Sequence, residues 1–327
     1  MQHPKLTPDN ISNYLDTRKE TKSAFEIFHV NYTDEEKEVI KNFNLTLPDD
    51  KTYTSYGHCG NNIPNIKTFF KSFGNNSDKD IDIVIKIINR LINHVLLGYK
   101  KNYYWISIRI ANSNHDWDIP RWHRDGLYIP NGHLSSKFVT VVKGPGTFLK
   151  EDTKESKDIF DSIRKEFDED KSTENYQEKE KKWRPKFDEK LKDVKTLQLE
   201  NDDGLIFFVG DHNSAIHSEP KMDKSRMFIS IVPGSKKDID TLIERKSGQC
   251  VSHQNGGYYN KSNKYRNKII YLEEIAKLIV EKLMQQQEEK AGVKRKKLEE
   301  RDKGLDMQAS CTGCYRPNLY CRCDTKN

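Results

Sequence analysis

A clear helical pattern covers residues 76–100 and begins with an Asn-Ser-Asp cluster that can cap a helix. Apolar residues then recur every three or four positions, which is the spacing of the buried side of a helix. These residues are Ile81, Val84, Ile85, Ile88, Leu91, Ile92 and Val95. We therefore predict a well-packed helix with Gly98 near its end. Residues 10–48 are polar with scattered apolar positions, and we expect short helices there.

Four later segments have the composition and alternation of strands. They cover residues 103–110, 138–142, 205–209 and 227–232. Turn signals containing Gly or Pro lie beside the last three of them. Short strands closed by such turns indicate an antiparallel sandwich or barrel. The predicted fold class is therefore an all-β core with added α-helices, α+β overall.

Residues 151–195 interrupt the strand pattern, because they are crowded with Lys, Glu and Asp. Ile159, Phe160, Ile163 and Phe167 fall on one face of a short helix within this segment. We interpret it as an insertion between two strands. Two readings remain open, a solvated helical excursion and a lid over a pocket.

A second long amphipathic pattern covers residues 269–303. We expect its apolar first half to pack on the body of the protein and its charged second half to be a solvated helix or a linker. The predicted organisation is a helical N-terminal elaboration over 1–100, a core over 101–240 that contains the insertion, a loop and helix over 241–308, and a cysteine segment over 309–325.

The composition is polar for a globular protein, since 34% of the 327 residues are hydrophobic and 32% are charged. One core must therefore coexist with long solvated helices, insertions or tails. The formal net charge is +6, and residues 291–327 hold nine basic and five acidic side chains, so the body is close to neutral. A protein that coats nucleic acid is not built in this way, although the tail can touch phosphate.

The sequence contains no apolar run as long as a membrane-spanning helix, which takes about 18 residues. The N-terminal segment shows no apolar stretch after a basic start, so we expect no secretory signal. The expectation is an intracellular protein, cytoplasmic or nuclear, that is not secreted and has no membrane partner.

Four of the six cysteines lie close together near the C-terminal end of the sequence: Cys311, Cys314, Cys321 and Cys323. Without a secretory signal, such a cluster indicates metal ligation ahead of disulfides. Four thiolates can close a tetrahedral structural Zn site, with Pro317 assisting the turn. A redox dithiol is the alternative interpretation.

The most informative stretch is residues 120–129, in which His123 and Asp125 are separated by one residue. On an extended segment this spacing puts both side chains on the same side of the chain, so an imidazole and a carboxylate can face one ion. A second stretch, residues 210–234, supplies His217 and, nine residues later, Arg226. These side chains are the candidates for a metal site.

Two histidines and one carboxylate form a facial triad, which leaves three coordination positions of a non-haem Fe(II) ion open. A 2-oxo acid can take two of these positions and dioxygen the third. A guanidinium deeper in the barrel can hold the far carboxylate of the 2-oxo acid in a two-pronged pair. Arg226 is the candidate for this role, with the hydroxyl of Ser230 beside it.

Other residues compete for these roles. His212 also lies in the distal loop, but the distance from His217 to Arg226 and the strand-like Ala-Ile pair before it favour His217. Asp125 as a turn residue before Gly126 is the alternative for the carboxylate. We interpret His115, His133 and His253 as structural, and Trp105, Trp117 and Trp122 as core aromatics ahead of pocket walls.

The pattern Trp-His-Arg-Asp-Gly, then Gly-Pro-Gly-Thr after a strand, then Ala-Ile-His-Ser-Glu-Pro followed by Arg-x-Phe-x-Ser resembles the Fe(II)/2-oxoglutarate-dependent dioxygenases. The resemblance covers residues 103–150 and 196–235 and implies a double-stranded β-helix, or jelly-roll, core. It implies His123, Asp125 and His217 as iron ligands and Arg226 as the clamp for the C5 carboxylate of 2-oxoglutarate. In this family, decarboxylation of 2-oxoglutarate to succinate and CO₂ is coupled to hydroxylation or oxidative demethylation of a substrate.

Two features depart from the family pattern. The charged insertion lengthens the separation of the iron ligands, and Ser230 lies four residues after Arg226 where the family commonly has two. Arg109 and Tyr104, on the strand before the motif, are further candidates for contact with the cosubstrate. In related halogenases a halide replaces the third protein ligand. Because Asp125 is present, the sequence favours oxygen insertion over halogenation.

The cysteine segment has a likeness of its own. The pattern Cys-x-x-Cys-x-Arg-Pro-x-x-x-Cys-x-Cys over residues 311–323 is similar to the opening zinc motif of the DTW-domain family of tRNA-modifying enzymes. Only this short segment matches, so the likeness supports a zinc knuckle and not that enzyme activity. Beside a basic linker and two tyrosines, the knuckle can bind RNA, DNA or a protein surface, or form a zinc-stapled cap.

The function hypothesis is an Fe(II)- and 2-oxoglutarate-dependent oxygenase with structural zinc in its tail. The expected cosubstrates are 2-oxoglutarate and dioxygen, and the primary substrate stays open, with a slight preference for a macromolecule, protein or nucleic acid. One rival is a cupin-like metal enzyme that uses no 2-oxo acid. The other is an inactive jelly-roll adaptor that binds nucleic acid or protein through its basic tail and zinc knuckle.

Overall fold

The computed structural model describes residues 3–126, 136–172, 175–210 and 213–252. The chain divides into two compact units, residues 1–246 and 247–327, and the elements below belong to the first unit apart from the end of the last helix. Several predicted features lie outside the described residues: the amphipathic segment 269–303, His133, His212, His253, and the cysteines Cys311, Cys314, Cys321 and Cys323.

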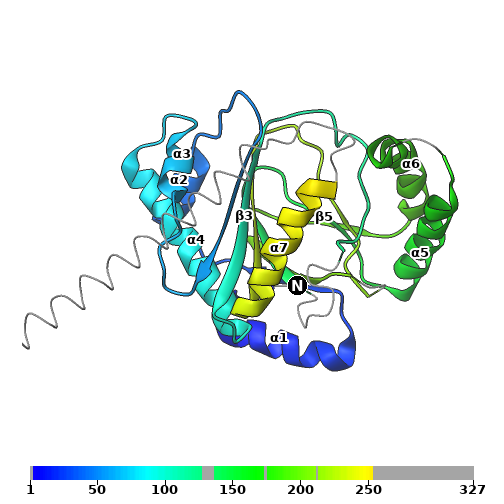
Figure 1. Ribbon diagram of the computed structural model, residues 1–327, viewed down its shortest axis with the longest axis horizontal. Coiled ribbons are helices and arrows are strands. Elements are labelled where there is room, and N and C mark those ends of the chain that lie inside the picture. The colour runs from blue at the N-terminus through cyan, green and yellow to red at the C-terminus, as the bar shows by residue number, and fades with distance from the viewer. Residues whose placement is uncertain (1–2, 127–135, 173–174, 211–212, 253–327) are drawn as a thin grey trace, which may run out of the picture. The chain divides into compact units, whose positions relative to one another are not determined.

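A six-stranded antiparallel sheet forms the centre of the first unit (Figure 1). Across the sheet the strands are β1 (Phe25–His29), β7 (Asp203–Phe208), β4 (Ser136–Lys143), β9 (Arg226–Gly234), β3 (Tyr103–Ala111) and β2 (Lys51–His58). The four predicted strands correspond to β3, β4, β7 and β9. The edge strands β1 and β2 are additions. The short helices expected over residues 10–48 are present as Pro8–Thr21 and Asp34–Asn42, and β1 lies between them.

A smaller antiparallel sheet contains β6 (Thr196–Gln198), β5 (Phe148–Lys150) and β8 (His217–Ser218). His123 pairs with His217 of β8 as an isolated antiparallel bridge. The pairing is therefore nested, since β3 pairs with β9, residue 123 with β8, β4 with β7, and β5 with β6. This nesting of the first strand with the last is the connectivity of a jelly roll, which confirms the predicted fold class.

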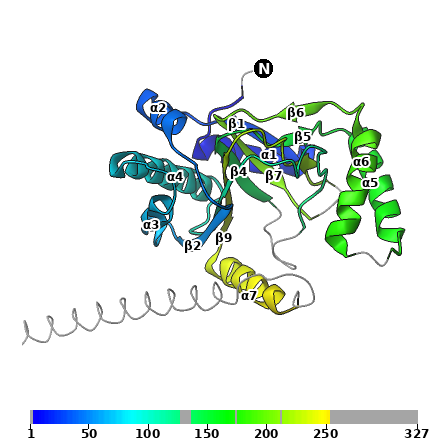
Figure 2. The same cartoon turned by 90° about the horizontal axis from the view of Figure 1, so that it is seen from above.

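Four helices pack against one face of the large sheet, here called the outer face: α1 (Pro8–Thr21), α2 (Asp34–Asn42), α3 (Ile66–Lys71) and α4 (Asp78–Gly98) (Figure 2). The predicted helix over 76–100 is α4. The Ser77 hydroxyl accepts a hydrogen bond from the Asp80 amide at its N-terminus. At its end, a Cβ atom on Gly98 would lie 2.5 Å from the Cβ of Ile11, so the close approach of α1 and α4 requires glycine.

The opposite face of the large sheet, here called the inner face, packs partly against the small sheet. Val139, Leu205 and Phe207 of the large sheet share a hydrophobic cluster with Leu149 of β5. The rest of the inner face carries polar and charged side chains, as the alternating burial of β3 shows. The functional residues predicted from the sequence therefore fall between two sheets.

The charged insertion forms a hairpin of two helices between β5 and β6, α5 (Lys154–Glu169) and α6 (Tyr176–Leu191) (Figure 1). Its apolar residues form a cluster with Trp122 and Ile216, which flank the two candidate histidines in sequence. Trp122 Nε1 donates to Asp188 Oδ1 at 2.9 Å, and Lys150 Nζ donates to the Leu191 carbonyl oxygen at 2.7 Å. The insertion thus packs one face of each helix against the segments that carry the two candidate histidines. Its interpretations as a solvated excursion and as a lid both stay predictions.

The last described element is α7 (Lys236–Ser252), which follows β9. Its first turn is closed by Ser235, whose hydroxyl accepts from the Asp238 amide, while the Asp238 carboxylate accepts from the Ser235 amide. Among the described helices, none has the length and apolar character that crossing a membrane requires.

Candidate metal centre

The two candidate histidines are held side by side by backbone pairing. The His123 amide donates to the His217 carbonyl oxygen at 2.9 Å, and the His217 amide donates to the His123 carbonyl oxygen at 3.0 Å. Their imidazole rings are 4.2 Å apart between centroids. Residues that are far apart in the sequence therefore meet because the jelly roll pairs the segment at 123 with β8.

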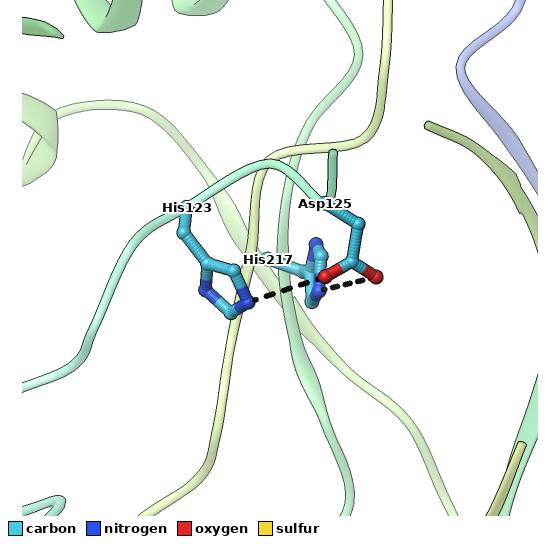
Figure 3. A group of neighbouring side chains, drawn as sticks. All are labelled: His123, Asp125 and His217. Carbon is cyan, nitrogen blue, oxygen red and sulfur yellow. Dashed lines mark ion pairs between the residues drawn. The ribbon is translucent and has the colours of Figure 1, made fainter. Parts of the chain in front are cut away.

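Asp125 completes the group (Figure 3). Its Oδ1 lies 3.7 Å from His123 Nε2, and its Oδ2 lies 3.7 Å from His217 Nε2. One ligand atom from each of the three residues lies within 4.8 Å of the others. The main chain of Asp125 is fixed by a hydrogen bond from the Gly210 amide to its carbonyl oxygen at 2.8 Å. The structure thus brings together the three residues that the sequence singled out, and their role as iron ligands stays a prediction.

Each imidazole is oriented by a backbone carbonyl. His123 Nδ1 lies 2.7 Å from the Arg121 carbonyl oxygen, and His217 Nδ1 lies 3.1 Å from the Ala215 carbonyl oxygen. A carbonyl can only accept, so each Nδ1 carries a proton, and Nε2 is the ring nitrogen that each histidine can offer to a metal. Histidines that bind metals are oriented in the same way, through a hydrogen bond from the nitrogen that does not bind the metal.

Electrostatics favour the protonation states that a metal needs. Burial, and secondarily the neighbouring His123 ring, lower the pKa of His217 to about 3, so this imidazole is neutral at neutral pH. Burial opposes ionisation of Asp125, but Lys137, His217 and His123 outweigh it and hold the pKa of this carboxyl well below its usual range. A neutral imidazole and an ionised carboxylate are the forms that bind a divalent ion.

Two ion pairs beside the triad were not predicted from the sequence. Lys137 Nζ lies 2.5 Å from Asp125 Oδ2. Arg121 binds Glu219 through two hydrogen bonds, at 3.1 Å from Nε and 2.5 Å from Nη2, and the same Nη2 lies 3.3 Å from His123 Nε2. A signal existed in each case, since Lys137 interrupts an apolar strand and both Arg121 and Glu219 lie two residues from a candidate ligand.

Arg226 occupies the start of β9 and is only 8% exposed. Its Nη2 donates to Thr147 Oγ1 at 2.7 Å, and its Nε has no hydrogen-bond partner among the described residues. Burial lowers the pKa of Arg226 to about 10. The charge of Glu219 raises this pKa, and the charge of Arg109 lowers it. A buried guanidinium with an unused donor has the chemistry to bind an anion.

The strand register places Arg226 and Ser230 on one face of β9. Ser230 lies opposite Val139 of β4 and Ser107 of β3, and Lys137 lies two residues before Val139. Because side chains alternate along a strand, all of these residues share the inner face. The clamp candidate and the ammonium beside Asp125 therefore belong to the same side of the large sheet.

The remaining candidate residues lie either on the inner face of the large sheet or in a hydrophobic core. Arg109 is on the inner face and exposed, whereas Tyr104 is 1% exposed within the outer core, so a contact between Tyr104 and the cosubstrate is excluded. Trp122 is a core aromatic, as predicted. Trp105 stacks on Tyr56 of β2, with ring centroids 6.0 Å apart, on the inner face.

A second group of potential metal ligands was not predicted. His29, Asp202 and Asp203 also bring their ligand atoms within 4.8 Å of one another. Its members are already engaged or exposed, since Asp203 Oδ2 accepts from the Glu200 amide and the His29–Asp202 pair is more than one third exposed. Exposed acidic groups of this kind are common without a metal.

No family model and no curated protein matches this chain. Among solved structures, it is similar to the Kdo hydroxylase KdoO, a non-haem Fe(II) α-ketoglutarate-dependent dioxygenase, with a TM-score of 0.37 and 8% identity over 80% of this chain and 99% of that one. A prolyl-4-hydroxylase from Pseudomonas putida has a TM-score of 0.34 and 7% identity over 72% of this chain and 96% of that one.

A 2OG-Fe(II) oxygenase family oxidoreductase from Burkholderia pseudomallei has a TM-score of 0.33 and 8% identity over 68% of this chain and 88% of that one. The structural neighbours are thus Fe(II)/2-oxoglutarate oxygenases at low similarity. Because each TM-score is below 0.5, the function has to be inferred from the site itself.

Proposed function

We propose that this protein is an Fe(II)- and 2-oxoglutarate-dependent oxygenase that hydroxylates or oxidatively demethylates its substrate. The observation that carries the proposal is the group of His123, Asp125 and His217, with each Nδ1 engaged by a backbone carbonyl and each Nε2 near the carboxylate. Two imidazoles and one carboxylate suit non-haem Fe(II) and leave open positions for a chelating keto acid.

When bound, the iron supplies the redox chemistry that couples decarboxylation of 2-oxoglutarate to oxidation of a C–H bond. The chain supplies orientation and charge. His123 and His217 present fixed nitrogen atoms, and Asp125 presents a carboxylate that stays ionised. Neither His217 nor Asp125 needs to change its protonation state to hold a divalent ion.

Arg226 is proposed to bind the far carboxylate of 2-oxoglutarate. Its guanidinium is buried, is oriented by Thr147, and keeps Nε without a partner among the described residues. A carboxylate can satisfy this donor in a charge-assisted hydrogen bond, which removes the penalty of leaving it buried and unpaired. Ser230, on the same sheet face, is proposed to donate to the same carboxylate.

An anaerobic titration tests the proposal. Addition of Fe(II) and 2-oxoglutarate to the purified full-length protein is expected to give the weak visible charge-transfer band of a chelated keto acid. His123→Ala is expected to abolish the band. The matched control is His115→Ala, because His115 is exposed and bonded to Asp118 away from the triad. No band in the wild type, or an intact band in His123→Ala, would contradict the proposal.

Two further measurements separate the rival functions. Formation of succinate coupled to O₂ consumption is expected here and is absent from a cupin-like enzyme that uses no 2-oxo acid. Deletion of residues 305–327 is expected to leave uncoupled 2-oxoglutarate turnover intact, whereas an adaptor would lose its partner. The zinc knuckle is proposed as structural, so zinc bound to the full chain should be lost in a Cys311→Ser, Cys314→Ser variant.

A further inference from the structure

Lys137 is an unusual neighbour for a metal-binding carboxylate. It lies in β4 between Ser136 and Phe138, is 8% exposed, and places Nζ 2.5 Å from Asp125 Oδ2 and 4.9 Å from the centroid of the Phe207 ring. Lysine is seldom buried to this extent unless it is paired. The sheet therefore holds an ammonium against the carboxylate that is proposed to bind iron.

This arrangement has an electrostatic cost for a metal. A ligating carboxylate is commonly oriented by hydrogen bonds in its outer shell. A full positive charge at hydrogen-bond distance also draws electron density from Asp125 and repels a second cation bound to the same group. Lys137 therefore weakens the affinity of the triad for a free divalent ion.

The same charge favours an anion that binds to the metal. Lys137 shares the inner face with Arg226, so two cationic side chains lie on the side of the sheet where the keto acid is expected. 2-Oxoglutarate carries two negative charges, and its carboxylate at the keto end binds close to the metal. Positive charge beside Asp125 thus opposes the metal alone and stabilises the metal together with a dianion.

We propose that Lys137 is a positioning residue that couples the two ligands, lowering affinity for the divalent ion and raising affinity of the metal-loaded site for the 2-oxo acid. This inference rests on the proposed function, because the anion is taken to be 2-oxoglutarate. It predicts that removal of the charge changes the two affinities in opposite directions. A residue that only supports the fold would change both in the same direction.

The test uses the full-length protein, Mn(II) in place of Fe(II), and two variants. Lys137→Met removes the charge and the hydrogen bond, whereas Lys137→Gln keeps a donor for Asp125 and removes only the charge. Calorimetry or electron paramagnetic resonance gives the Kd of Mn(II), and a second titration gives the Kd of 2-oxoglutarate for the Mn(II)-loaded protein. Thermal melting establishes that each variant is folded.

In both variants Mn(II) is expected to bind about tenfold more tightly and 2-oxoglutarate about tenfold more weakly. Lys143→Met is the matched control on the same strand, since Lys143 Nζ donates to the carbonyl oxygens of Lys41 and Phe43 and not to the triad. This control should leave both affinities unchanged.

Three results would overturn the inference. A fall in both affinities in a folded variant would show that Lys137 only supports the structure of the site. Wild-type affinities in Lys137→Gln would show that the hydrogen bond, and not the charge, matters. If the variants bind Mn(II) more tightly but even wild-type Mn(II)-loaded protein fails to bind 2-oxoglutarate, the proposed cosubstrate is wrong and the coupling falls with it, while the repulsion between Lys137 and the metal stands.

Discussion

The two faces of the large sheet differ although the same strands build both. On β3, Ile106, Ile108 and Ile110 point outward and are fully buried beneath the helices, while Ser107 and Arg109 between them point inward and remain accessible. Strand alternation thus places one set of residues in the core and the other on the face of the proposed ligand site. Neighbours in the sequence should therefore respond to substitution in different ways.

Strand β9 shows the same difference between its outer-face and inner-face residues. Met227, Ile229 and Ile231 belong to the outer core, whereas Arg226 and Ser230 belong to the inner face. The comparison predicts a double dissociation. Substitutions on the outer face should lower the free energy of unfolding and spare ligand binding, and substitutions on the inner face should do the reverse.

The largest expected effect is on metal binding. His217→Ala removes a proposed ligand whose ring is fixed by the Ala215 carbonyl, so affinity for Mn(II) should fall more than about a hundredfold, beyond the loss from an outer-shell change. Calorimetry measures this loss. His29→Ala, in the second His–Asp group, is the matched control and should bind Mn(II) like the wild type. The reverse pattern would move the metal site to that second group.

The next effect is on stability. Ile108→Ala removes a fully buried side chain of the outer core and should lower the free energy of unfolding by about 2 kcal/mol or more. Urea denaturation measures the change, and Mn(II) affinity should stay within about threefold of the wild type. Ser107→Ala is the adjacent control and should change stability by less than about 1 kcal/mol. Equal losses from both substitutions would break the distinction between the faces.

An intermediate effect is expected on 2-oxoglutarate binding when Arg226, the proposed clamp, is replaced. Arg226→Met keeps much of the side-chain volume and removes the buried charge, so 2-oxoglutarate should bind Mn(II)-loaded protein about ten- to hundredfold more weakly. Mn(II) binding should be retained, because the guanidinium of Arg226 is hydrogen-bonded to Thr147 and is not a proposed metal ligand. A titration of 2-oxoglutarate measures the change, and unchanged affinity would remove Arg226 from the site.

The smallest effect concerns the α5–α6 hairpin. Asp188→Ala leaves Trp122 Nε1 without its acceptor and should cost about 1 kcal/mol of stability. Because Trp122 adjoins His123, Mn(II) affinity should also fall, by less than about tenfold. Glu189→Ala, on the exposed side of α6 and paired with Lys192, is the control. An unchanged metal affinity in Asp188→Ala would confine the hairpin to a role in stability.

The sequence predicted the elements whose signal is local. The helix α4 has a cap and a full apolar stripe, and β3, β4, β7 and β9 have alternation or β-branched runs. β1 was not predicted because it is only five residues long, and β2 was not predicted because most of its residues are polar. Both strands also depend on partners distant in the chain. Their pairing is a property of the assembled sheet.

The triad was accessible from the sequence for a related reason. The spacing of His123 and Asp125 places them on one side of an extended segment, and the resemblance supplied His217 as the distant partner. Lys137 and the Arg121–Glu219 pair were missed because no spacing rule tells which side chain a buried lysine or arginine meets. That information lies in the register between strands and in the packing of the two sheets.

The most direct test of the account is a crystal structure of the protein with Mn(II) and 2-oxoglutarate under anaerobic conditions, with anomalous scattering to locate the metal. The account predicts one Mn(II) ion about 2.0–2.2 Å from Nε2 of His123, Nε2 of His217 and a carboxylate oxygen of Asp125, with the far carboxylate of 2-oxoglutarate at Arg226. An ion bound elsewhere, such as at His29 and Asp202, with the triad still held by its present hydrogen bonds, would contradict it.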